Sequence, residues 1–130
     1  MKKNSKVKES RSKIVAKLDS VFSEYIRRRY AQNDIAKCVT CGKEDHWKNQ
    51  QAGHFMSRKY YSTRWDEDNV QVQCAGCNIF RAGEQYKFSL YLGQEKSEEL
   101  FLKSHKTAKL SNVDLLEMID TYQQKLSELE

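Results

Sequence analysis

The fold is decided by residues 38–78, which begin with Cys38-Val39-Thr40-Cys41 and end with Cys74-Ala75-Gly76-Cys77-Asn78. Two pairs of cysteines, each pair separated by two residues, present four thiolates, which is the ligand set of a structural tetrahedral zinc site. The segment between the pairs is longer than a minimal zinc ribbon needs. The sequence therefore predicts one shared zinc ion that fixes the ends of a larger element.

The cysteine count supports this interpretation, because all four cysteines of the chain belong to these two pairs. Disulfides are disfavoured in a reducing compartment. A thioredoxin-like redox motif would need a βαβ background, which the sequence does not predict. Redox-active or incidental thiols are the remaining alternatives.

Length and composition indicate a small domain with a modest core. The chain has 130 residues, of which 38% are hydrophobic and 32% are charged, so zinc would add stability that the core lacks. The net charge of +5 suits a polyanionic partner but is not specific by itself. No apolar run is long enough to span a membrane, and no apolar segment of a signal peptide follows the basic N-terminus. We expect a cytoplasmic protein with no membrane partner.

Around the cysteines the patterns predict a hairpin followed by a helix. Residues 51–56 and 70–73 are the expected strands, with an irregular loop over residues 57–68, and residues 42–50 are expected to form a polar turn. A helix should begin near Asn78 and break at Ala82-Gly83, since glycine is costly inside a helix.

Helices are expected on both sides of this region. Apolar residues at helical spacing predict a helix from Ser10 to the Arg27-Arg28-Arg29 run. A short helical segment is expected at residues 97–104. Ser111 and Asp114 form a capping box that should start a last helix, with an apolar seam that packs on the N-terminal helix or pairs with a second subunit.

Three polar residues stand where the scaffold could carry chemistry. His54 follows two small residues on the first strand, Asn69 opens the second, and Asn78 starts the helix, so an antiparallel hairpin would bring the three together. Histidine can activate water, and amide oxygens can orient an imidazole or bind a hard cation. With a divalent ion this suffices for phosphodiester hydrolysis. A structural histidine and two capping asparagines are the alternative interpretation.

The series C-x2-C, A-G-H-F and N-V-x-x-Q-C-x-x-C-N resembles the HNH, or ββα-metal, nuclease superfamily, and more narrowly the phage NinG/Rap recombination-protein family. The resemblance covers residues 21–93. It implies an α+β fold, with a zinc-stapled, treble-clef-like ββα-metal core and flanking N- and C-terminal helices. The expected segments are a basic helix at 1–34, the nuclease core at 35–94, and a C-terminal helical segment at 95–130 that packs on the core or on a partner subunit.

The resemblance also implies an activity, namely metal-dependent endonuclease cleavage of branched DNA such as Holliday junctions or D-loops. His54 would deprotonate water, Asn69 would orient that histidine, and Asn78 would bind the catalytic Mg²⁺ or Mn²⁺. Cleavage would leave 5′-phosphate and 3′-hydroxyl ends. Zinc on Cys38, Cys41, Cys74 and Cys77 would be structural, because a full thiolate shell leaves no open position.

One position departs from the superfamily pattern. Many HNH nucleases place an Asp or His directly before the base as a second metal ligand, and here that residue is Gly53. Either water and DNA oxygens complete the ion's shell, or a carboxylate comes from elsewhere. The candidates for that carboxylate are Glu84, Asp66 and Asp68. His46 and His105 match no motif position, and we expect both to be exposed loop residues.

The predicted partner is DNA, with a homodimer as one option and the bacterial host cytoplasm as the location if the protein is phage-encoded. Cationic candidates for phosphate contacts are Arg27, Arg28, Arg29, Arg58, Lys59 and Arg64. The arginine run could equally be a solvated helix end. Loop aromatics could stack on unpaired bases, although we expect Trp65 to pack. The competing functions are a non-catalytic zinc module that binds DNA or recombination partners, and a sequence-specific HNH nicking enzyme.

Overall fold

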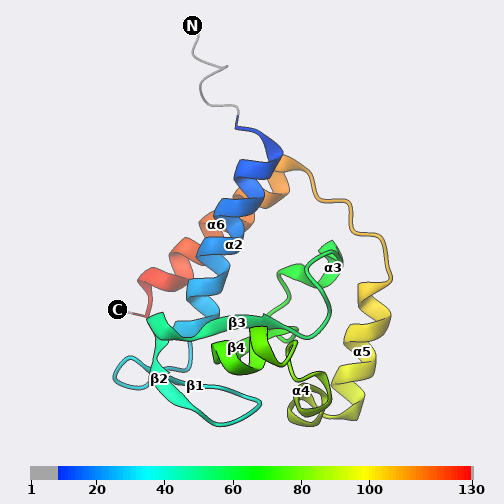
Figure 1. The fold of residues 1–130 in the computed structure, drawn as a ribbon. Coiled ribbons are helices and arrows are strands. Elements are labelled where there is room, and N and C mark those ends of the chain that lie inside the picture. The colour runs from blue at the N-terminus through cyan, green and yellow to red at the C-terminus, as the bar shows by residue number, and fades with distance from the viewer. Residues whose placement is uncertain (1–8, 130) are drawn as a thin grey trace, which may run out of the picture.

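Two small antiparallel sheets lie at one end of the molecule, and helices flank them (Figure 1). The computed structural model describes residues 9–129. The first sheet pairs β1 (Ile35–Lys37) with β2 (Glu44–His46), and the second pairs β3 (Gln51–His54) with β4 (Val70–Gln73). The architecture is therefore mixed α+β, as the sequence predicted.

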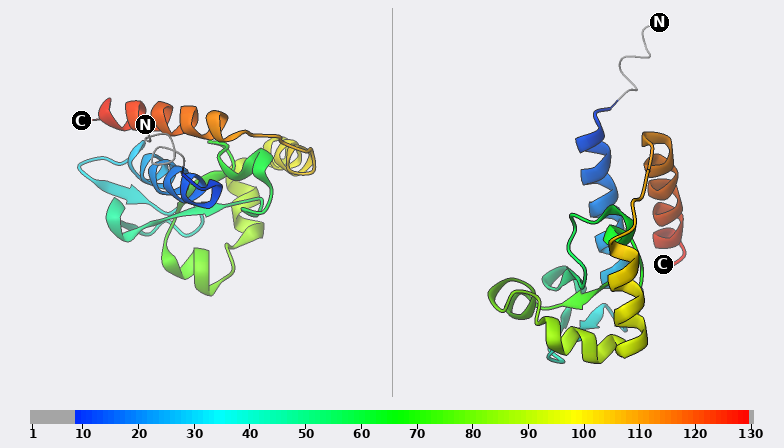
Figure 2. Two further views of the ribbon diagram at one scale, coloured as in Figure 1. Left: turned by 90° about the horizontal axis from the view of Figure 1, so that it is seen from above. Right: turned by 90° about the vertical axis from the view of Figure 1, so that its right-hand side faces the viewer.

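The helix α2 (Arg11–Arg28) packs along α6 (Asn112–Ser127), and the two run in the same direction (Figures 1 and 2). Their N-terminal ends are joined by Arg11, which donates to Asn112 Oδ1 at 2.9 Å. Further along, the rings of Phe22 and Tyr122 meet edge to face, 4.9 Å apart. The apolar seam of the last helix thus packs on the N-terminal helix, which was one of the two predicted arrangements.

One hydrophobic core joins these helices to the β3–β4 hairpin. Its buried members come from both helices, from the strand β4 and from the segment before it: Ile14, Val15, Leu18, Phe22, Ile26, Trp65, Val70, Leu115, Ile119 and Tyr122. Trp65 is only 5% exposed, so it packs in the core as expected rather than being free to stack on a base. The core holds the hairpin in a fixed place against α2.

The segment expected to be a polar turn is instead partly a strand. Glu44–His46 pair with β1, and the 3-10 helix η1 (Trp47–Asn49) follows. The tight turn of the first cysteine pair creates this hairpin, with the Gly42 N–H donating to the Cys38 carbonyl at 2.9 Å. The loop after β3 also contains a short helix, α3 (Tyr61–Arg64). The predictions of a polar turn at residues 42–50 and of an irregular loop at residues 57–68 therefore each missed a short regular element.

The break after the second cysteine pair was predicted correctly. The π-helical turn η2 (Gly76–Phe80) is followed by three residues with positive φ: Ala82 at 52°, Gly83 at 88° and Glu84 at 48°. The helix α4 (Gln85–Leu92) then starts in a new direction, and α5 (Gln94–Ser104) follows it.

The capping box at the start of α6 is also present. The Ser111 hydroxyl accepts from the Asp114 N–H, and the Asp114 carboxylate accepts from the Ser111 N–H. None of the helices in residues 9–129 combines the length and the apolar character that crossing a membrane requires.

Candidate functional site

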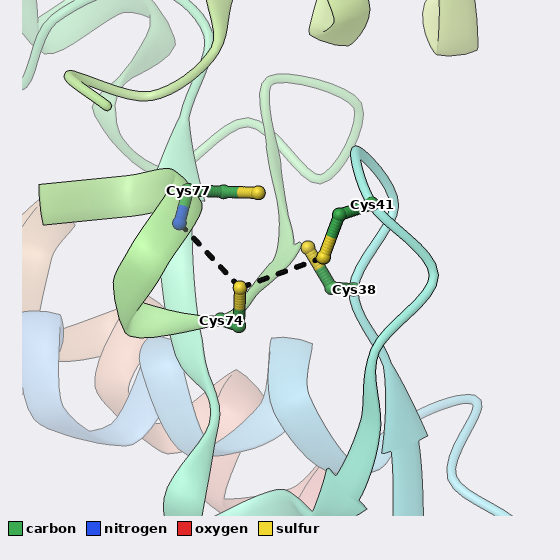
Figure 3. Close-up of side chains that lie close together, drawn as sticks. All are labelled: Cys38, Cys41, Cys74 and Cys77. Carbon is green, nitrogen blue, oxygen red and sulfur yellow. Dashed lines mark hydrogen bonds between the residues drawn. The ribbon is translucent and has the colours of Figure 1, made fainter. Parts of the chain in front are cut away.

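The four cysteines converge from two separate parts of the chain (Figure 3). Cys38 and Cys41 lie in the turn between β1 and β2, whereas Cys74 follows β4 and Cys77 belongs to η2. All four sulfur atoms lie within 4.8 Å of one another, and the Sγ atoms of Cys41 and Cys74 are 3.6 Å apart. A tetrahedral zinc with Zn–S bonds of about 2.3 Å needs sulfurs ~3.8 Å apart. The cluster therefore fits a metal ion such as zinc.

The surroundings of the sulfurs also suit thiolate ligands. Burial opposes ionisation of Cys38, but hydrogen bonds from the Thr40 hydroxyl and from backbone N–H groups outweigh it and lower the Cys38 pKa to about 6. For Cys41 a backbone N–H of Lys43 favours the thiolate, but desolvation and the three neighbouring sulfurs raise the pKa to about 12. Four thiolates within 4.8 Å of one another would repel each other unless a cation lay between them. A zinc ion would stabilise all four thiolates and leave no open position, so its role would be structural.

Arg81 adds a positive charge beside the cluster. Its Nη2 donates to Cys77 Sγ at 3.2 Å, and its Nε donates to Glu84 Oε2 at 2.8 Å. These contacts raise the pKa of Arg81, chiefly through the sulfur. Glu84, one of the candidates for a second catalytic metal ligand, is thus paired with cations, since Lys87 Nζ also lies 3.8 Å from it.

His54 is held by one backbone carbonyl. The register of β3 and β4 places it opposite Val70, and its Nε2 lies 3.0 Å from the carbonyl oxygen of Arg64. A carbonyl only accepts, so in the neutral ring the proton sits on Nε2 and the lone pair is on Nδ1. Burial lowers the pKa of His54, although the Arg64 carbonyl works in the opposite direction. At pH 7 the imidazole is therefore neutral and can accept a proton at Nδ1.

Asn69 fixes the loop that supplies this carbonyl. It is fully buried; its Oδ1 accepts from the Met56 N–H at 2.7 Å, and its Nδ2 donates to the carbonyls of Met56 and Thr63, both at 3.0 Å. Thr63 precedes Arg64, whose carbonyl contacts His54. The side-chain hydrogen bonds of Asn69 therefore hold the loop that carries the Arg64 carbonyl, and none of these bonds reaches His54.

His54 and Asn78 line the same cavity, which has a volume of about 580 Å³. Asn78 lies in η2, and its Nδ2 donates to Gln51 Oε1 at 2.7 Å, which leaves its own Oδ1 as an acceptor. Arg27 and Arg58 also line this cavity. The cavity therefore combines a neutral imidazole, an amide oxygen and two cations.

Internal partners hold Arg27, whose Nε donates to the Ser23 carbonyl at 3.2 Å and whose Nη1 donates to the Trp47 carbonyl at 3.3 Å, and they also hold other predicted cations. Arg29 donates through Nη2 to the carbonyls of Glu67 and Val70 and has a side chain only 6% exposed. Arg64 forms a two-point ion pair with Asp19, which raises the pKa of Arg64.

Two further predicted cations, Arg28 and Lys59, each lie over an aromatic ring. Arg28 pairs with Glu24 at 2.9 Å and lies over the Trp47 ring. Lys59 is exposed and lies over the Tyr60 ring.

None of the three predicted acidic ligands lines the cavity. Asp66 is bound by Lys103, and Asp68 lies 3.1 Å from Lys96; neither residue lines the cavity, and Glu84 does not line it either. The only acidic residue among the described residues that line it is Asp19, which sequence reasoning missed. Asp19 already accepts hydrogen bonds from Arg64 and from Trp65 Nε1, the latter at 2.9 Å. It therefore braces α2 against the loop.

The two other histidines lie outside the cavity. His46 is half-buried in β2, not in a loop as predicted, and its Nδ1 accepts from the Lys48 N–H at 3.1 Å. His105 is exposed directly after α5, as expected.

Comparison with known proteins supports one family. A family model described as Bacteriophage Lambda NinG protein matches residues 1–130. Comparisons with curated proteins and with solved structures find no match. Because the family model covers the whole chain, this protein belongs to the bacteriophage lambda NinG family.

Proposed function

We propose that this NinG-family protein is a metal-dependent, structure-selective DNA endonuclease of the HNH type that acts on branched recombination intermediates. The observation that carries the proposal is the state of His54. Its Nε2 lies 3.0 Å from the Arg64 carbonyl, which favours the tautomer with the lone pair on Nδ1, burial lowers its pKa, and it lines the same cavity as Asn78. An antiparallel hairpin, a following helical turn and a cysteine cluster at their base are also the arrangement that the HNH motif calls for.

The reaction would be hydrolysis of one phosphodiester bond. Nδ1 of His54 takes a proton from water as the water oxygen attacks phosphorus, and the bond to the 3′ oxygen breaks. The departing oxygen takes a proton from solvent, which leaves 3′-hydroxyl and 5′-phosphate ends. A Mg²⁺ or Mn²⁺ ion beside Asn78 would supply positive charge for the phosphate and the leaving oxygen.

Cations around the cavity suit a nucleic-acid backbone. Arg27 and Arg58 line it directly; Arg58 has a side chain 62% exposed, and its closest acidic partner among the described residues is 4.0 Å away. Such side chains bind phosphates through charge and fix the position of the backbone without reading sequence. The preference for branched DNA rests on the resemblance to the phage recombination family, and a homodimer would suit a junction with two strands to cut.

A second function is favoured by one specific observation. The position before His54 is a glycine, and the only described acid that lines the cavity is already paired with Arg64. A zinc-stabilised module that binds junctions without cutting them would need no catalytic ion. The two functions differ in a single outcome, which is strand cleavage.

The test is a cleavage assay on a synthetic four-way junction and on linear duplex of the same sequence, each with Mg²⁺, with Mn²⁺ and with a chelator. We expect nicks in the junction that depend on the divalent ion and carry 5′-phosphate ends. Asn78→Ala should cut more slowly and recover in part at high Mn²⁺. The matched control Asn49→Ala changes an exposed asparagine and should cut like the wild type. Tight junction binding without cleavage under any ion would contradict the proposal and favour the binding module.

A further inference from the structure

Gly53 is a glycine because another side chain fills the space beside it. A Cβ atom built on Gly53 would lie 1.9 Å from Oε1 and 2.7 Å from Cδ of Gln73. Distances this short are excluded for non-bonded atoms. The carboxamide of Gln73 therefore occupies the volume in which a side chain at residue 53 would begin.

The orientation of that carboxamide is fixed by two acceptors. Its Nε2 donates to the Gly83 carbonyl at 2.8 Å and to the Thr40 hydroxyl at 3.1 Å. Because the Gly83 carbonyl cannot donate, the amide cannot be turned over without setting two carbonyl oxygens against each other. Oε1 must therefore face Gly53.

This oxygen is buried and has no hydrogen-bond partner among residues 9–129. Gln73 itself is fully buried. Leaving a buried acceptor without a partner is costly, and native proteins rarely do so unless water or an ion completes the site. Gln73 Oε1 is thus a buried oxygen with a free lone pair, which water or a cation could bind.

Gln73 lies on the same face of the hairpin as Gln51, the residue that binds the proposed metal ligand Asn78. Alternation along the strands places Gln51 and Gly53 on one face, with Gln73 paired opposite Gln51. Gln51 accepts the hydrogen bond from Asn78, and Gly83, which holds the Gln73 amide, lines the cavity with Asn78. Gln73 is therefore linked to the cavity through Gly83, and it lies opposite Gln51, the residue that binds Asn78.

We propose that Gln73 supplies, through Oε1, the second protein ligand of the divalent ion next to Asn78, in place of a side chain at residue 53. This inference rests on the proposed function. Amide oxygens are suitable ligands for hard cations, but two neutral ligands add no charge attraction. The ion should therefore bind weakly to the free protein and more tightly when a DNA phosphate is present.

The test measures Mn²⁺ binding by electron paramagnetic resonance on the zinc-loaded full chain, with and without a junction whose cleavable bonds are blocked. Gln73→Met keeps the length of the side chain and removes the oxygen. We expect its Mn²⁺ dissociation constant to rise at least about tenfold. Gln71→Met, on the same strand and with bonds to the Asp68 and Glu67 carbonyls, should stay within about twofold of the wild type.

A double variant separates ligand loss from a loosened fold. In Gly53→Asp/Gln73→Ala the shortened side chain makes room for a carboxylate at residue 53. We expect this variant to bind Mn²⁺ more tightly than the wild type, and Gln73→Ala alone to bind it more weakly. Equal Mn²⁺ affinity for the double variant and Gln73→Ala would overturn the assignment, as would unchanged affinity in Gln73→Met.

A measurement on the wild type needs no substitution. Crystals soaked in Mn²⁺ should give an anomalous difference peak within about 2.5 Å of Gln73 Oε1. A peak that contacts Asn78 but lies far from Gln73 would refute the assignment of Gln73 as a ligand and would leave the proposed nuclease function unaffected. If the wild type binds no Mn²⁺ even with junction present and cuts nothing, the proposed function itself fails.

Discussion

Replacing Asn69 with alanine tests whether the loop between β3 and β4 is what positions His54. The Asn69 side chain is fully buried and makes three hydrogen bonds of 2.7 to 3.0 Å. Each is worth about 1 kcal/mol net, and the groups left behind are shielded from water. We expect Asn69→Ala to lower the free energy of unfolding by about 3 kcal/mol, which is roughly a hundredfold in the folding equilibrium.

The assay is urea unfolding of zinc-loaded protein followed by circular dichroism. Asn49→Ala is the matched control, because Asn49 is exposed and makes a single bond to Asp45. Its effect should stay within about 0.5 kcal/mol. In the folded Asn69→Ala protein, ¹⁵N spectra should also show that His54 has lost its Nε2-protonated form in part. If Asn69→Ala lowers the free energy of unfolding by less than about 1 kcal/mol, or if its His54 tautomer is identical to that of the wild type, the reasoning is refuted.

Three further predictions concern the metal, the histidine and the loop. Purified reduced protein should contain one zinc per chain. Chelation of this zinc should abolish cooperative unfolding in a thermal melt, since structural zinc contributes on the order of 10 kcal/mol to the free energy of folding. A melt that chelation leaves unchanged would contradict the zinc assignment. Because burial lowers the pKa of His54 below its ordinary 6.5, the single-turnover cleavage rate should reach half of its plateau at a pH below 6.5 and be flat above about pH 7.5. A rate that still rises from about pH 7.5 to pH 9 would contradict a neutral His54. Asp19→Asn should lower the free energy of unfolding in urea by about 2 kcal/mol, because it weakens the ion pair with Arg64. A decrease below about 0.5 kcal/mol would mean that the contacts of Asp19 do not stabilise the packing of α2 against the loop.

The elements that sequence reasoning predicted are those whose signal is local. Apolar residues such as Leu18 and Ile119 recur at helical spacing and become the contact between α2 and α6. The cysteine pairs and the alternation of residues 70–73 placed the metal cluster and the returning strand. His54 and Asn78 share a cavity because the hairpin and the turn after it bring together the positions that the motif singled out.

The missed features depend on partners that lie far away in the sequence. Glu44–His46 form a strand because a tight turn brings them to β1, and their side chains carry no alternating pattern. Arg29 and Arg64 look like phosphate contacts in the sequence, yet one binds backbone carbonyls and the other binds Asp19. A positive charge in a sequence does not reveal whether a folded partner already neutralises it.

The role of Gly53 was also hidden in the sequence. Its neighbour Gln73 reaches across the hairpin only because β3 and β4 pair in one register, and the turn of the first cysteine pair supplies Thr40 as a second partner for the amide. A glycine in a strand signals that something approaches closely. What approaches could be named only from the structure.

The most direct measurement is the single-turnover cleavage rate of His54→Ala on a four-way junction, at protein concentrations that saturate binding. His46→Ala is the control, because His46 lies outside the cavity. The account predicts a rate at least about a hundredfold below that of the wild type, with unchanged junction affinity and zinc content, and a control that cuts normally. A His54→Ala rate within about threefold of the wild type, against the loss expected when a general base is removed, would contradict the account.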